Sequence, residues 1–223
     1  MASDVEICNL ALSHLGDTAN ITSIDPPEGS AQAEHCSRFY PVARGMLIEA
    51  HDWSWATRRI SLTPLVATVS PWAYAYGKPN LMIKAIAVLD PEASDDYTIP
   101  AAFETEQAYL PLSYAPLAYA PQPFVIETLS TGEEAILTNQ ENAVLRYVES
   151  VTDTAKFPPL AVMALSWLVA SMLAGPIIKG ADGAAEAKRC LAVYKEVLGM
   201  AVNSDSNQPL SMVKHIVPWI NRR

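Results

Sequence analysis

The distribution of proline constrains the fold of this 223-residue chain more than any other feature of its sequence. Nine of its 17 prolines fall between Thr57 and Thr154. Proline lacks a backbone N–H and fixes φ, so it interrupts helices and central strands. Short apolar runs alternate there with turn residues, and the expected strands are 59–62, 81–83, 85–89, 124–128, 135–138 and 144–148. We therefore expect a small antiparallel β sandwich or barrel in this segment.

One part of the proline-rich segment has its own repeat. Tyr109, Tyr114 and Tyr119 each stand two residues before a proline, at five-residue spacing. Proline at this density blocks both helices and central strands, so the stretch 109–123 is expected to be an extended loop of polyproline-II character. It is either an ordered surface loop or a partner contact.

The N-terminal segment has helical periodicity. Ser3 and Glu6 have the spacing of a capping box, which predicts a helix beginning near Asp4, and Gly16 fits its C-terminal stop. A second helix is expected after Ser30, as far as about residue 52.

Two features mark this second helix. Pro41 lies inside it and is expected to bend or divide it near residue 40. Trp53 and Trp55 follow its expected end, and we interpret them as an aromatic clamp that braces the helical hairpin against the β segment.

Helical periodicity returns after Asp153. A third helix is expected from Pro158 to Gly175-Pro176, and a fourth from about 184 to 201. No charged residue occurs from Phe157 to Ile178, and a membrane span needs roughly 20 such positions. Because prolines stand at both ends and no aromatic belt flanks the segment, we favour a buried central helix, with a membrane-inserted hairpin as the alternative.

These segments together predict an α+β protein. Two helix pairs that each expose an apolar stripe can hide both stripes by packing together, which predicts an antiparallel helical bundle with the β domain inserted. The first half of the bundle is predicted at 1–56 and its second half at 155–203. The β domain between them is predicted at 57–154, and an extended C-terminal docking tail at 204–223.

The charge and the cysteines narrow the possible functions. The net charge of −9 comes without a basic block, which argues against gripping nucleic acid. Cys8, Cys36 and Cys190 form no Cys-x-x-Cys pair and fit buried apolar positions in a reducing compartment. A metal site of Cys8, Cys36 and His35 matches no zinc spacing, so we expect neither a metal nor a cofactor. Asp4 and Glu6 occupy the place of a basic n-region, and no signal peptide is expected.

The sequence contains none of the common catalytic motifs. Phosphate-binding glycine loops, a Gly-x-Ser-x-Gly elbow and a His-Glu-x-x-His helix are all missing from it. The acidic pairs Asp95-Asp96 and Glu133-Glu134 fit solvated turns. We therefore expect a protein that is not an enzyme; the alternative, a glycan or peptidoglycan hydrolase, needs two carboxylates across a cleft.

Several motifs resemble a known family in their order and spacing. They are Ile7-Cys8-Asn9-Leu10-Ala11-Leu12 with Leu15-Gly16, Ser30-Ala31-Gln32-Ala33-Glu34-His35-Cys36 with Tyr40 and Arg44, His51-Asp52-Trp53-Ser54-Trp55-Ala56, Arg146-Tyr147-Val148, Val151-Thr152-Asp153, Phe157-Pro158-Pro159, Ala164-Leu165 and Leu168-Val169-Ala170. Together they resemble podovirus tail tubular protein A, the head-to-tail adaptor of short-tailed phages. The motifs cover both helical parts, about half of the chain, whereas the Tyr-x-Pro stretch departs from the family pattern.

The resemblance implies a structural protein of the virion neck, assembled in the host cytoplasm. It implies a homo-oligomeric ring, usually of twelve copies, that binds the portal protein above and the tail nozzle or tube protein below. DNA passes through such a ring without sequence-specific binding, and no membrane is involved.

The C-terminal tail is the candidate site for docking on the portal protein. It combines an apolar cluster with two arginines, and its candidate docking residues are Ile216, Val217, Trp219, Ile220, Arg222 and Arg223. A tail of this kind can order in a cleft of the portal protein, with its arginines meeting acidic groups. The alternative is that Trp219 packs on its own domain.

Overall fold

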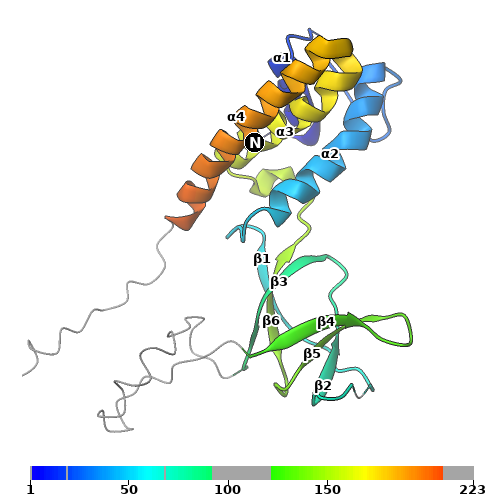
Figure 1. Ribbon diagram of the computed structural model, residues 1–223, viewed down its shortest axis with the longest axis vertical. Helices are drawn as coiled ribbons and strands as arrows, with labels where there is room; N and C mark the ends of the chain where they lie inside the picture. Colours follow the sequence, from blue (N-terminus) through cyan, green and yellow to red (C-terminus); the bar gives the residue numbers. More distant parts are fainter. Residues whose placement is uncertain (1, 19, 68, 92–121, 208–223) are drawn as a thin grey trace, which may run out of the picture. The chain divides into compact units, whose positions relative to one another are not determined.

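The chain is an α+β protein, as the sequence predicts. A computed structural model describes residues 2–18, 20–67, 69–91 and 122–207, and in them it has four α-helices and two three-stranded antiparallel sheets (Figure 1). The chain divides into two compact units. The first contains Met1–Leu47 and the stretch from Asp153 onward, and the second is Ile48–Thr152.

The first helix, α1 (Asp4–His14), has the predicted start and stop. The hydroxyl of Ser3 accepts from the backbone N–H of Glu6 at 3.1 Å, and the Glu6 carboxylate accepts from the backbone N–H of Ser3 at 2.7 Å. The capping box is therefore complete. Gly16 has a φ of +73°, a conformation that favours glycine after a helix end.

The loop after α1 is anchored back onto that helix by Asn9. Its amide donates to the carbonyl oxygen of Ile21 and accepts from the backbone N–H of Ile21, both at 2.9 Å. The next helix, α2 (Ala31–Glu49), runs through Pro41 without a break, so the expected division near residue 40 is wrong. Pro41 is exposed, and within a long helix it removes a single backbone donor.

The second unit consists of the two sheets. Strand β6 (Val144–Glu149) lies between β1 (Thr57–Ser61) and β3 (Met82–Leu89), and β5 (Glu134–Thr138) lies between β2 (Tyr74–Gly77) and β4 (Phe124–Thr128). Residues from both sheets share one apolar core, formed by Leu62, Tyr76, Met82, Val88, Ile136, Ala143, Leu145 and Tyr147.

Two strand predictions need correction. The runs 81–83 and 85–89 form one strand, β3, which keeps its pairing with β6 through register shifts at Met82/Lys84 and Ala85/Ala87. Strand β2 was not predicted, because it has only 4 residues and two of them, Ala75 and Gly77, have low strand propensity.

The last two helices, α3 and α4, pack on each other, and α3 also packs on α1. Helix α3 (Pro159–Ile178) continues through Gly175-Pro176, so its expected end there is wrong. Pro176 is the third residue from the end of the helix and removes one backbone donor from it. Lys179 and Gly180, with φ of 63° and 64°, form the turn to α4 (Gly180–Ser206).

Helix α4 is longer than expected at both ends. It begins four residues before the expected start at 184 and extends past the expected tail start at 204. The polar residues of its last turn are compatible with a helix end, where side chains stay in water.

Candidate functional site

A cluster of side chains joins three helices of the first unit. The ring of His14 in α1 stacks on that of Trp167 in α3, with centroids 3.7 Å apart and planes 6° from parallel. The guanidinium of Arg189 in α4 lies 5.5 Å from the centroid of the Trp167 indole. This distance is within the range of a cation–π contact.

Hydrogen bonds fix the orientation of this cluster. Ser166 donates its hydroxyl proton to the carbonyl oxygen of Met163 at 2.8 Å, so it can accept from Nε2 of His14, 3.0 Å away. This pairing corresponds to the neutral imidazole tautomer that carries its proton on Nε2. Burial, and then the guanidinium of Arg189, lower the pKa of His14 below its usual value.

Arg189 is itself held in place by α4 and α1. Its Nε lies 2.8 Å and 3.0 Å from the two carboxylate oxygens of Glu186, and its second terminal nitrogen donates to the carbonyl oxygen of His14 at 3.3 Å. Every polar group named in the cluster has a partner within it. The cluster therefore fits a packing junction better than a reacting centre.

The aromatic residues after α2 belong to the second unit. Trp53 is 1% exposed, and its ring lies 5.7 Å from that of Trp55 and 4.9 Å from that of His51. The carbonyl oxygen of Trp53 accepts from the hydroxyl of Thr57 at 2.8 Å, at the start of β1. Trp53 and Trp55 thus lie together, and the bracing role remains a prediction.

Two sequence predictions lie outside the described residues. The six candidate docking residues between 216 and 223 all belong to the undescribed C-terminal segment. Most of the Tyr-x-Pro stretch, as far as residue 121, also lies outside the residues that the structure describes.

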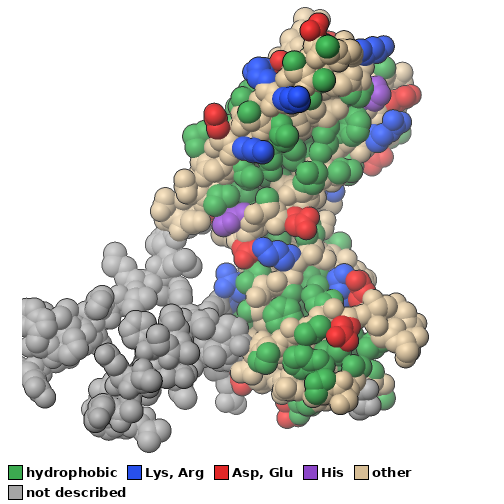
Figure 2. Space-filling model, viewed as in Figure 1, with side chains coloured by type: hydrophobic (Ala, Val, Ile, Leu, Met, Phe, Trp, Pro, Cys, Tyr) green, Lys and Arg blue, Asp and Glu red, His purple; other side chains and the backbone are tan. Residues whose placement is uncertain are grey.

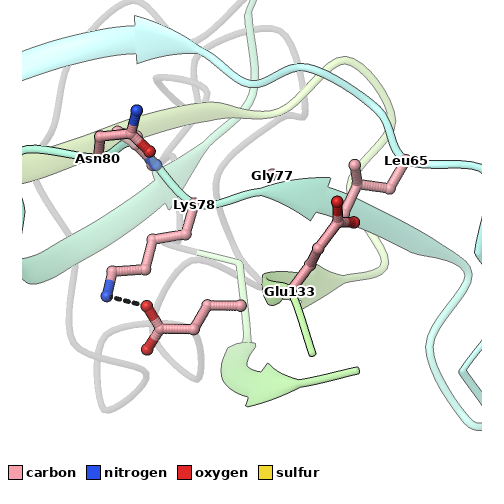
Figure 3. Close-up of a pocket in the computed structure, with 7 residues that line it drawn as sticks. Leu65, Gly77, Lys78, Asn80 and Glu133 are labelled. Atoms are coloured by element: carbon pink, nitrogen blue, oxygen red, sulfur yellow. Dashed lines mark hydrogen bonds and ion pairs between the residues drawn. The ribbon is translucent and has the colours of Figure 1, made fainter. Parts of the chain in front are cut away.

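A surface pocket of about 410 Å³ lies in the second unit between the end of β2 and the start of β5. Lys78 and Glu134 form an ion pair of 2.6 Å at its wall (Figure 3). Glu133 and Glu134 are neighbours in the chain, and Glu134 is engaged by the lysine. This arrangement differs from two free carboxylates facing each other across a cleft.

The three cysteines are buried free thiols, as their apolar sequence neighbours predict. Cys8 and Cys36 are hydrogen-bonded to each other, and this contact together with burial raises the pKa of Cys8. Within the described ranges, no group of three or more His, Cys, Asp or Glu side chains is arranged to hold a metal ion.

Helix α3 is unusual in composition. By length and composition it is the one helix in the described part of the chain that is able to cross a membrane, and 50% of its apolar window is buried in the protein. A buried core helix of a soluble protein meets the same criteria, so this finding is weak evidence for a membrane.

Comparisons with known proteins assign no family. The sequence matches no protein-family model, and no curated protein matches it.

The sequence did not single out the junction of His14, Trp167 and Arg189. The three residues lie far apart in the chain and share no motif. Trp167 has no sequence signal of its own, because α3 is apolar on all sides.

Proposed function

We propose that this chain is the structural head-to-tail adaptor of a short-tailed phage. In this proposal, copies of the chain form a ring between the portal protein and the tail nozzle, and DNA passes through its lumen. The chain has no catalytic role and needs no cofactor. It resides in the virion neck after assembly in the host cytoplasm.

The observation that carries the proposal is the incomplete burial of α3. Its 20 residues include no charged side chain, yet Met163 and Ile178 are 39% and 37% exposed. Met163 and Ile178 lie 15 residues apart on the same side of this uncharged helix, and in this proposal they belong to one surface that binds a neighbouring copy. A subunit of a ring covers such a surface when its neighbours bind.

The packing of α1 on α3 supports the proposal further. Among the sequence motifs that resemble the adaptor family, α1 carries residues 7–12, and α3 carries Ala164-Leu165 and Leu168-Val169-Ala170. These two helices pack together within one compact unit. That unit contains segments from both sides of the β unit, which supports a helical bundle with an inserted β domain.

The charge of the chain fits the passage of DNA. A net charge of −9 disfavours adhesion to the phosphate backbone, so DNA can slide through the ring. The apolar α3 is then a core and interface helix in this proposal, and no membrane is a partner.

Electron microscopy of the purified chain mixed with portal rings of the phage tests the proposal. We expect rings of this chain stacked coaxially on the portal. Turnover of glycan or peptidoglycan by the pure protein, without such rings, would favour the hydrolase alternative. Partition of the free protein into detergent would instead favour insertion into a membrane.

A further inference from the structure

Charge is distributed unevenly over the first unit. Residues 1–37 contain six Asp and Glu residues and no Lys or Arg. Four of these carboxylates are exposed, namely Glu6, Asp25, Glu28 and Glu34. The exposed charges of the N-terminal segment of this unit are therefore acidic.

The outer face of α4 carries two exposed lysines, Lys188 and Lys195, and the exposed Glu196 follows Lys195 in the chain. Lys188, Leu191 and Lys195 are three and four residues apart, so they lie along one side of the helix, and all three are exposed. Leu191 is 38% exposed. Figure 2 shows basic side chains spaced along α4, with hydrophobic and acidic side chains nearby. In the described part of the chain, neither lysine forms an ion pair, whereas Arg189 pairs with Glu186.

The outer face of α1 has a matching pattern. Glu6, Leu10 and Ser13 are four and three residues apart and are exposed, with Leu10 at 37%. They line a surface hollow of about 580 Å³, together with Ala2, Asn9 and Asn20. The α1 face thus has one exposed carboxylate, an exposed leucine and a hollow, and the α4 face has two exposed lysines and an exposed leucine.

We propose that the α1 face of one copy of this chain binds the α4 face of the next copy. This inference deepens the proposed ring and rests on it. Two copies of the α4 face would repel each other, as would two of the α1 face, so the charges favour a head-to-tail contact between unlike faces. A contact of this type generates a ring when its rotation closes. The leucines supply the buried apolar area, and the charges select the partner face.

Two sets of substitutions test the two faces separately. Lys188→Glu with Lys195→Glu reverses the α4 face, and Leu10→Lys places a cation in the α1 face. We expect each variant to weaken self-association, measured by sedimentation velocity over a concentration series, by at least about tenfold. Circular dichroism and melting temperature establish that each variant is folded. Glu6→Gln, which can keep the capping box, should weaken self-association less, by about threefold.

Mixing the variants gives the decisive measurement. The α4 variant keeps an intact α1 face and the α1 variant an intact α4 face, so a mixture should form one-to-one dimers that grow no further. Arg38→Glu with Lys156→Glu makes the same change in net charge at other exposed positions of this unit and should leave association unchanged. Absence of the mixed dimer, or equal weakening by this control pair, overturns the proposed contact.

The outcomes separate this inference from the proposed function. If the double lysine variant still forms rings on the portal, the contact is wrong and the adaptor role stands. If the chain associates through these faces but does not bind the portal, the contact stands and the adaptor role falls. A chain that stays monomeric at every concentration overturns the contact.

Discussion

Gly183 in α4 approaches the backbone of Ala174 in α3 so closely that an added Cβ would lie 2.9 Å from the Ala174 carbonyl oxygen. The backbone oxygen belongs to a packed helix and cannot move aside like the end of a flexible side chain. We expect Gly183→Ala to force α3 and α4 apart and to cost about 1–3 kcal/mol in the free energy of unfolding. Denaturant unfolding measures this change.

Gly199 supplies a matched control on the same helix. No atom lies within 4 Å of its hypothetical Cβ. Gly199→Ala should therefore stabilise the protein by about 0.5–1 kcal/mol, through helix propensity alone. Equal effects of the two substitutions would show that the close approach of α3 and α4 has no energetic consequence.

The junction at His14 predicts a stability that depends on pH. Burial and the Arg189 guanidinium lower the pKa of His14, so the folded state disfavours the protonated imidazole. The unfolded chain then binds more protons between the lowered pKa and the ordinary value of 6.5. The stabilisation is complete above 6.5 and is lost as the pH falls through the folded-state pKa.

Melting temperatures of the wild type and of His14→Gln from about pH 7.5 to pH 5 check this sign. The wild type should lose more stability than the variant as the solution becomes acidic. Parallel curves for the two proteins would place the pH dependence elsewhere.

The burial of Trp53 predicts a large loss of stability on truncation. Its side chain is 1% exposed, and Trp53→Ala removes a large buried surface and leaves a cavity. We expect the free energy of unfolding to fall by about 3–5 kcal/mol. Trp55→Ala, at a half-buried position, should cost clearly less. A nearly unchanged melting temperature for Trp53→Ala would contradict a structural clamp.

The proposed tail anchor predicts a loss of portal binding without a loss of folding. A chain truncated after Pro209 ends before all six candidate docking residues. We expect its melting temperature to stay close to that of the full chain while its binding to portal rings becomes undetectable by co-sedimentation. Undiminished binding would assign the docking role to another surface.

Local signals in the sequence predicted local structure well. The capping box of Ser3 and Glu6 and the glycine at position 16 set both ends of α1, because these contacts span only a few residues. The breaks predicted at Pro41 and Pro176 are wrong, because each proline removes a single donor from a helix that packing elsewhere maintains.

Local sequence signals did not predict the contacts between distant parts of the chain. The junction of His14, Trp167 and Arg189 depends on how three helices pack, and none of these residues has a motif of its own. The pocket at Lys78 depends likewise on the register between β2 and β5. Side-chain periodicity reports which face of an element is apolar, and it leaves the partner of that face unspecified.

The two hydrogen bonds between Asn9 and Ile21 have a consequence for assembly. They tie the connection that follows α1 to the helix itself, so the start of the segment that carries Asp25 and Glu28 is held at a fixed place beside the acidic side of α1. In the proposed ring, a neighbouring copy that binds this side of α1 therefore meets a preorganised surface. Binding then costs little conformational entropy of this loop, so a larger share of each weak attraction contributes to the affinity between copies.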